Sequence, residues 1–188
     1  MNDFYSDTKT KPSHAMLEYA LGRTFGDEQQ DEDPTTLELC ERVAHLLGKE
    51  SAVFLPSGTM CNEIAIMVQT SPGDEIICGR SSHIINFEGG APAAMSGVMI
   101  HPLDGKYGQF TDEDVRQALR SESRYEPISR MLCAEQTANL GGGAVWQLEK
   151  LDSVAQVAKN SGLSTHLDGA RLLNACCLLY TSPSPRDG

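Results

Sequence analysis

The fold of this chain is decided by the stretch His166-Leu167-Asp168-Gly169-Ala170-Arg171-Leu172-Leu173-Asn174-Ala175. It is typical of a short buried strand that ends in an acid, followed by a turn of small residues and the start of a helix. Open α/β sheets bind their ligands at the carboxyl ends of the strands, where Asp168 would lie. A carboxylate at that edge can hold a proton on the nitrogen of a heterocycle. The stretch therefore predicts an α/β fold with a ligand site at Asp168.

Strand and helix signals alternate along the rest of the chain, which is the pattern of a parallel sheet covered by helices. Apolar runs predict five strands, over residues 51–55, 75–78, 98–101, 130–134 and 165–167. Capping residues and apolar periodicity predict helices over residues 34–47, 60–68, 84–88, 112–119 and 148–160.

The composition of the 188 residues bounds the class of protein. Apolar residues make up 40% and charged residues 22%, which is enough to build a core and argues against disorder. The net charge of -11 makes nucleic acid or an anionic membrane surface an unfavourable partner. No apolar run approaches the ~20 residues of a membrane span. The start of the chain lacks the pattern of a signal peptide, and the six cysteines lack zinc spacing, so we expect a cytoplasmic protein without a metal site.

The segment Pro56-Ser57-Gly58-Thr59-Met60 follows a predicted strand and opens a predicted helix. Gly58 lets the backbone approach a ligand closely, and the hydroxyls of Ser57 and Thr59 lie beside the unpaired N–H groups of the first helical turn. This combination favours a phosphate site. An ordinary capped helix start would give the same residues.

Three further polar positions fall where a ligand could reach them. His83 follows a predicted strand and could stack on a flat ring or act as a base, or it could be a plain surface histidine. Ser6-Asp7-Thr8 could reach a carboxylate or form a simple loop. Glu135-Gln136-Thr137-Ala138-Asn139 closes a strand at the ligand-binding edge, or serves only to bond the loop to itself.

Taken in order, these parts resemble those of the pyridoxal phosphate (PLP) enzymes of the aspartate aminotransferase type, fold type I. The chain is similar to the threonine aldolase / aromatic amino acid β-eliminating lyase family over residues 4–176. The motifs that carry the resemblance are Phe4-Tyr5-Ser6-Asp7-Thr8-Lys9-Thr10-Lys11-Pro12, Gly48-Lys49-Glu50, Phe54 to Met60, Pro72-Gly73-Asp74-Glu75-Ile76-Ile77, Ser82-His83-Ile84, Glu88-Gly89-Gly90-Ala91 and His166 to Ala175.

The resemblance implies a three-layer α/β large domain, incomplete at its C-terminus, that binds PLP. It implies that Gly58 and Thr59 bind the cofactor phosphate, with Ser57 adjacent. His83 is expected to stack on the pyridine ring, and Asp168 to pair with the ring nitrogen, so these two residues are the expected catalytic pair.

The same resemblance implies the substrate contacts and the assembly. Arg171 is expected to reach the 3′-oxygen of the cofactor and the substrate carboxylate, which Ser6 helps to hold. The family is oligomeric, so a homodimer or homotetramer is expected when the protein is complete. The implied activity is cleavage of L-threonine or L-allo-threonine to glycine and acetaldehyde.

Two departures from the family pattern bear on this expectation. The family's Schiff-base lysine lies in a Ser-Lys-Gly segment beyond the position of Asp168, and none of the lysines matches that context: Lys9, Lys11, Lys49, Lys106, Lys150 and Lys159. Many members also carry a histidine where this chain has Ala138, and that histidine is a candidate base for the β-hydroxyl proton. The substrate preference is therefore open.

The end of the chain is expected to differ from the rest. We assign residues 1–176 to the N-terminal and major part of the PLP-dependent large domain, and residues 177–188 to a tail that looks foreign or disordered because Pro183 and Pro185 cannot continue a helix. A truncated enzyme without its lysine would be inactive alone. The alternatives are another PLP β-eliminating lyase, or a non-catalytic remnant of the fold that serves as a binding or assembly partner. A nicotinamide-binding domain is disfavoured because its glycine fingerprint is missing.

Overall fold

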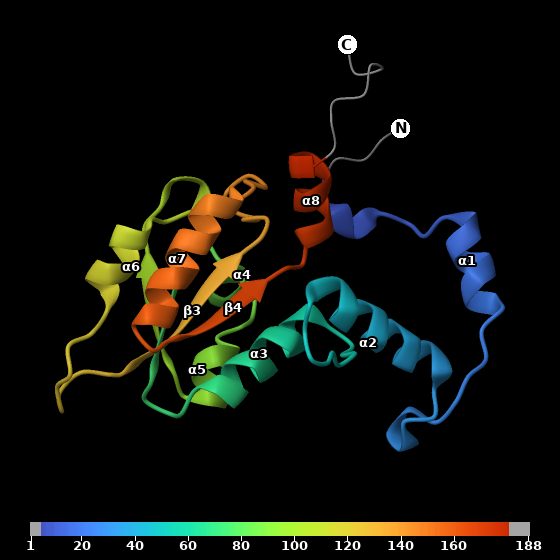
Figure 1. The fold of residues 1–188 in the computed structure, drawn as a ribbon, viewed down its shortest axis with the longest axis horizontal. Helices are drawn as coiled ribbons and strands as arrows, with labels where there is room; N and C mark the ends of the chain where they lie inside the picture. Colours follow the sequence, from blue (N-terminus) through green and yellow to red (C-terminus); the bar gives the residue numbers. More distant parts are fainter. Residues whose placement is uncertain (1–4, 181–188) are drawn as a thin grey trace, which may run out of the picture. The chain divides into compact units, whose positions relative to one another are not determined.

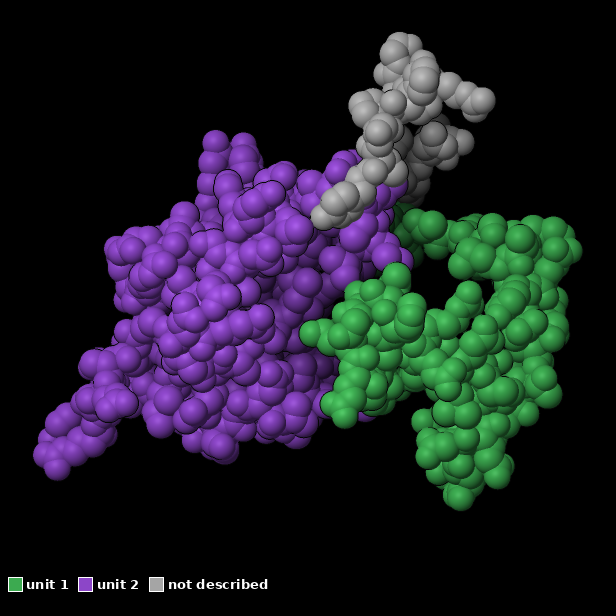
Figure 2. Space-filling model, viewed as in Figure 1, with its two compact units in different colours: residues 1–55 green, residues 56–188 purple. Residues whose placement is uncertain are grey.

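The computed structural model describes residues 5–180. The chain divides into two compact units, residues 1–55 and residues 56–188, which Figure 2 colours green and purple. Each unit is described by itself.

The first unit holds four helical segments, two of them short 3-10 turns. They are η1 (Asp7–Lys9), α1 (His14–Leu21), η2 (Glu28–Gln30) and α2 (Pro34–Leu47). The start and the end of α2 follow the sequence prediction. The Asp33 carboxylate accepts a hydrogen bond from the Thr36 N–H at 2.8 Å, and Gly48 ends the helix in the left-handed conformation with φ of 60°.

The strand predicted over residues 51–55 is wrong. This segment has no regular secondary structure. A strand exists only where a neighbour pairs its backbone groups, and the described part of the first unit contains no other strand. The apolar run has the residue types of a strand, but it does not show whether a partner strand is present.

The second unit is built on a four-stranded parallel sheet with the strand order β2-β1-β3-β4 (Figure 1). The strands are β1 (Glu75–Gly79), β2 (Met99–Leu103), β3 (Ser129–Glu135) and β4 (Ser164–Asp168). The helical segments are α3 (Gly58–Gln69), α4 (His83–Asn86), α5 (Ala91–Ser96), η3 (Lys106–Gly108), α6 (Asp112–Ala118), α7 (Leu148–Asn160) and α8 (Leu172–Tyr180). The other four predicted strands are thereby confirmed.

Helices cover both faces of this sheet, which confirms the three-layer α/β architecture (Figure 1). Alternate side chains of each strand enter opposite cores. Ile77 and Leu132 belong to the core under α6 and α7, which also holds Trp146. Ile76 and Met131, with neighbours from α3 and the segment after β1, form the core on the other face. Burial of nearly all residues of the central strands β1 and β3 explains why these two strands read as apolar runs.

Local signals fix the helices of the second unit. Thr111 and Asp114 form the predicted capping box at the start of α6, because each side chain bonds the backbone N–H of the other. The predicted helix over residues 148–160 is confirmed as α7. The helix predicted over residues 84–88 corresponds to α4, and Gly89 and Gly90, whose φ angles are 63° and 77°, separate it from α5.

A buried ion pair lies at the amino-terminal edge of the sheet. Glu75, the first residue of β1, is 1% exposed. Its carboxylate accepts hydrogen bonds from the Arg120 guanidinium at 2.8 and 3.1 Å, and the Ser129 hydroxyl lies 3.4 Å away. The His101 ring nitrogen Nδ1 is 3.5 Å from the same carboxylate. Each oxygen of this buried group therefore has a donor.

The C-terminal prediction falls partly outside the described residues. The helix α8 continues through Tyr180, and residues 181–188, which make up most of the predicted tail, are not described. Within residues 5–180, no helix has both the length and the apolar character needed to cross a membrane.

Candidate active site

Asp168 ends β4 at the carboxyl edge of the sheet, as the sequence predicted, and lies in register with Glu135 of β3. Its two oxygens have different partners. Oδ1 accepts a hydrogen bond from the Ala170 N–H at 3.2 Å, and Oδ2 accepts one from the Asn62 amide at 3.0 Å. The small-residue turn after β4 thus holds one side of the carboxylate, and helix α3 holds the other.

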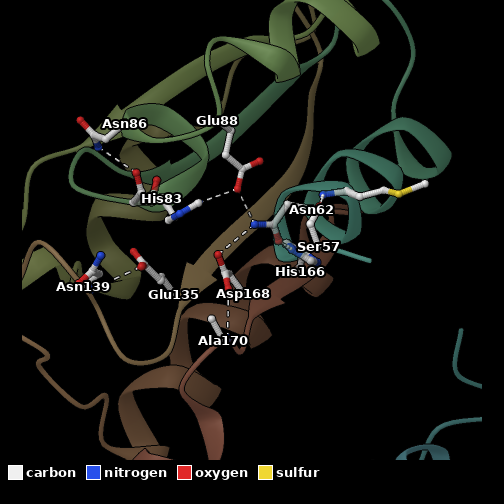
Figure 3. A network of polar contacts seen from close by, with 12 residues as sticks. Ser57, Asn62, His83, Asn86, Glu88, Glu135, Asn139, His166, Asp168 and Ala170 are labelled. Carbon is white, nitrogen blue, oxygen red and sulfur yellow. Dashed lines mark hydrogen bonds and ion pairs between the residues drawn. The ribbon is translucent and has the colours of Figure 1, made fainter. Parts of the chain in front are cut away.

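Asn62 connects this acid to two further side chains (Figure 3). Its Nδ2 also donates to Glu88 Oε1 at 2.7 Å, and its Oδ1 lies 2.8 Å from His166 Nε2. Because the amide oxygen is an acceptor, His166 carries its hydrogen on Nε2. Burial lowers the pKa of His166, although the charges of Asp168 and Glu88 act in the opposite direction. The imidazole is therefore held neutral as a donor.

His83 begins α4, directly after the loop that follows β1. Its Nδ1 lies 2.7 Å from Glu88 Oε1, and its side chain is 33% exposed while that of Glu88 is fully buried. One ring nitrogen of His83 and one carboxylate oxygen from each of Glu88 and Asp168 all lie within 4.8 Å of one another. The buried carboxylate of Glu88 and the amide of Asn62 thus bring the imidazole of His83 close to the carboxylate of Asp168 (Figure 3).

Glu135 lies beside this pair and is 8% exposed. Burial raises the pKa of Glu135, and the neighbouring charge of Asp168 raises it further. The backbone N–H of Asn139 and the charge of His83 act in the opposite direction. The protonated form of Glu135 is therefore favoured at the edge of the sheet, beside the carboxyl group of Asp168 on the adjacent strand.

The predicted phosphate segment forms the amino terminus of α3. Ser57 caps the helix, and its hydroxyl accepts a hydrogen bond from the Met60 N–H at 3.2 Å. Ser57 and Gly58 are exposed, and Thr59 is half-buried in the first turn. A Cβ built on Gly58 would meet nothing within 4 Å, so the approach to this helix end is open. Both the simple cap and the space for an anion are present.

The predicted substrate residues lie on different parts of the chain. Arg171 is half-buried just before α8, and its backbone N–H donates to the Gln136 carbonyl at 3.3 Å. Ser6 belongs to the first unit, where its hydroxyl caps η1 by accepting a hydrogen bond from the Thr8 N–H. Contact of either side chain with a substrate stays a prediction.

The polar end of β3 serves mainly to bond its own loop. The Gln136 side chain bonds both backbone groups of Trp146, at 3.0 and 3.2 Å. Ala138, where many family members were expected to carry a histidine, is 2% exposed. Its Cβ would be 3.0 Å from a Cβ built on Gly108 and 3.1 Å from one on Gly141, so the loops of these glycines enclose it. Ala138 does not present a side chain to an open site.

The sequence prediction assigned no role to four residues of this network, which are Asn62, Glu63, Glu88 and His166. Asn62 and Glu63 were the detectable pair, since two polar residues stand within the apolar run of α3. Such residues are buried only when they have partners or a function. Glu88 and His166 stood in the sequence analysis only as the first residues of two family motifs.

The residues at this edge fit PLP in chemical type. A helix amino terminus with exposed hydroxyls suits a phosphate, and Asp168 suits a protonated ring nitrogen. Together with the three-layer parallel α/β sheet, they define the class of PLP-dependent enzymes of fold type I.

The chain belongs to the β-eliminating lyase family, whose model matches residues 3–185. It is 37% identical over 183 residues to the probable low-specificity L-threonine aldolase 2 of Arabidopsis thaliana, covering 94% of this chain and 51% of that protein. It is 36% identical over 178 residues to the alanine racemase TOXG of Cochliobolus carbonum, covering 92% and 44%.

Solved structures agree with this assignment. A putative L-allo-threonine aldolase from Listeria monocytogenes superposes with a TM-score of 0.66 at 25% identity, covering 87% of this chain and 45% of that one. The chain spans about half the length of the curated relatives it matches. The family uses PLP, and its relatives carry more than one activity in their names.

Proposed function

We propose that the protein containing this chain is a PLP-dependent lyase that cleaves L-threonine or L-allo-threonine to glycine and acetaldehyde. The observation that carries the proposal is the double support of Asp168, whose oxygens accept hydrogen bonds from the Ala170 N–H and the Asn62 amide. The two donors fix the position of the carboxylate at the carboxyl edge of the sheet, and a carboxylate can hold a proton on a ring nitrogen. Bound PLP supplies the electron sink for the bond that breaks between Cα and Cβ.

The other residues have roles that follow from their positions. The exposed amino terminus of α3, with Ser57, Gly58 and Thr59, binds the cofactor phosphate. His83 stacks on the cofactor ring, with Nδ1 fixed by Glu88 and Nε2 left as the nitrogen able to accept the β-hydroxyl proton. Because Ala138 is enclosed, His83 is a better candidate for this base than any side chain at position 138.

The substrate carboxylate is the remaining group to be held. The guanidinium of Arg171, at the carboxyl edge of the sheet, suits a bidentate contact with it, and Ser6 contributes a hydroxyl. We further infer a homodimer or homotetramer that acts in the cytoplasm. These inferences rest on the family.

Direct assay tests the activity. The protein is incubated with PLP and L-threonine or L-allo-threonine, and acetaldehyde and glycine are measured. The matched assay with L-alanine follows racemisation, because one relative is named an alanine racemase. Acetaldehyde release supports the proposal. Racemisation without acetaldehyde, or products of β-elimination alone, would assign the protein to a different reaction of the family.

A second test addresses the missing lysine. None of the six lysines stands in a Ser-Lys-Gly segment, so we infer that the 188 residues alone bind PLP without a covalent bond. Borohydride reduction in the presence of PLP, followed by mass spectrometry, should give scattered low labelling. One dominant adduct at a single native lysine would overturn this inference.

The gene sequence beyond codon 175 distinguishes the lyase from the non-catalytic alternative. A Ser-Lys-Gly segment encoded beyond codon 175 supports the lyase. A genomic stop codon there, or the Ser-Pro tail itself in the genome, supports a remnant that acts as a binding or assembly partner.

A further inference from the structure

Glu63 is a buried acid for which the proposed reaction has no use. It follows Asn62 on α3 and is 3% exposed. Neither of its carboxyl oxygens has a donor among the described residues, and the same holds for Glu88 Oε2. An unpaired carboxylate in such a place costs several kcal/mol, roughly, so the two side chains require a common explanation.

The explanation is a proton shared between the two carboxyl groups. Glu88 Oε1 already accepts from the Asn62 amide and from His83, which marks Glu88 as the ionised partner. The side chains of Glu63 and Glu88 are close enough to interact, and two carboxyl groups can share a hydrogen bond only when one of them is protonated. The O–H of Glu63 then donates to Glu88 Oε2. Of the three unpaired oxygens of Glu63 and Glu88, only the second oxygen of Glu63 is then left without a partner.

We propose that Glu63 is a positioning residue that shares one proton with Glu88 and thereby fixes a single negative charge behind His83. The proposal deepens the proposed function and rests on it for the role of His83. Glu88 is the link, because it touches both the buried acid and the imidazole.

The arrangement makes the site sensitive to pH. Burial, with the neighbouring Glu88, raises the pKa of Glu63 to about 7. Below that pH the pair carries one charge, and Glu88 is held from both sides. Above it, Glu63 loses its donor O–H and two buried negative charges repel each other, so the partner of His83 is no longer fixed.

The other ionisable groups around α3 define the background of this titration. β3 contributes Glu135, whose pKa is raised by burial, and Cys133, whose thiol pKa burial raises well above its usual value. β4 contributes His166 and Asp168, both bonded to Asn62. A test must therefore distinguish Glu63 from Glu135, the other carboxyl group with a raised pKa.

Infrared spectroscopy of the protein without substrate or cofactor detects the shared proton directly. The wild type should show the C=O stretch of a buried protonated carboxyl group that disappears as the pH rises through about 7. Glu63→Gln should lose this band, Glu135→Gln should keep it, and Glu149→Gln, a change at an exposed residue of α7, should leave the band and its pH dependence unchanged. A band that survives Glu63→Gln would overturn the proposal.

The absorbance of bound PLP tests the effect on the site. The wild type should show a step at about pH 7, and Glu63→Gln, which keeps an N–H donor toward Glu88, should show the low-pH spectrum throughout. Glu63→Leu removes the donor and should weaken PLP binding about tenfold below about pH 7, where Glu63 of the wild type carries its O–H. A step that persists in Glu63→Gln would also overturn the proposal.

The two readouts separate this proposal from the proposed function. An infrared band that titrates as expected in a protein that releases no acetaldehyde would leave the shared proton standing and refute the lyase. Acetaldehyde release by a protein that lacks the band would refute the shared proton alone.

Discussion

Glu75 and Glu88 are both buried carboxyl groups beside the same sheet, and their surroundings differ. At the amino-terminal edge, the guanidinium of Arg120 contacts both oxygens of Glu75, and Ser129 adds a hydroxyl. At the carboxyl edge, Glu88 has two donors on one oxygen, none on the other, and a second buried acid, Glu63, beside it. Among the described residues, no arginine or lysine forms an ion pair with Glu88 or with Glu63.

The difference separates a structural acid from a functional one. A carboxylate matched by a fixed guanidinium keeps one charge state and holds β1 to the segment after α6. A carboxylate with a neutral amide, an imidazole and another acid can change its proton with little rearrangement. Such groups cluster where protons are handled, which agrees with the position of His83 and Asp168.

The largest effect should come from Asp168→Asn. The amide has the shape of the acid but cannot hold a proton on the ring nitrogen, so acetaldehyde release should fall about 10²–10⁴-fold. Far-ultraviolet circular dichroism and the unfolding midpoint should stay close to wild type, because the amide oxygen can still accept from the Ala170 N–H, and Asn62 keeps Glu88 as an acceptor. Near-normal turnover would remove Asp168 from the proposed mechanism.

Arg120→Ala should affect the other edge of the sheet and only stability. It leaves Glu75 buried without its cation, and breaking such a pair costs about 3 kcal/mol in the free energy of unfolding. Denaturant unfolding measures the loss. Arg116→Ala, which removes a surface ion pair with Asp112, is the matched control and should cost under about 1 kcal/mol. A large loss of turnover per folded molecule in Arg120→Ala would show that the two edges are coupled.

The same contrast explains how far the sequence could be interpreted. The central strands β1 and β3 were predicted correctly because nearly all of their residues are buried, which leaves apolar runs. The edge strands β2 and β4 are partly exposed, and their place in the alternation of strands and helices supported their prediction. The fifth failed because an apolar run does not reveal whether a partner strand exists. His83, Asp168 and the segment Ser57 to Thr59 were found because they stand at the ends of elements, where motifs are legible.

The supporting network could not be predicted in the same way. Asn62 and Glu63 lie inside a helix, and the hydrogen-bond partners of Asn62 are 26 or more positions away in the sequence. Only packing brings α3 against β4 and the segment before α5. Spacing likewise did not show that the loops of Gly108 and Gly141 enclose Ala138.

The pH dependence of stability in Glu63→Gln tests whether the buried acids Glu63 and Glu88 share a proton. In the wild type the folded state binds more protons than the unfolded state between the ordinary pKa of 4.5 and the raised value of about 7. Stability is therefore full below the lower value and falls as the pH rises from that value through the higher one. Glu63→Gln should lack this loss in denaturant titrations, whereas Glu149→Gln should retain it. Equal losses in wild type and Glu63→Gln would show that Glu63 is already ionised in the folded protein.

The smallest effect should come from His166→Gln, and its sign is opposite. Burial lowers the pKa of His166 below its ordinary 6.5, so the unfolded state binds more protons as the pH falls. The wild type should be fully stabilised above about pH 6.5 and should lose stability as the pH falls below that value. Gln keeps an N–H donor for the Asn62 oxygen but cannot take up a proton, so His166→Gln should lose less. His14→Gln, at a side chain that is 87% exposed, is the control and should follow the wild type. If His166→Gln and the wild type lose the same amount on acidification, His166 accepts a proton freely, and Asn62 is not held by a neutral imidazole as the hydrogen bond implies.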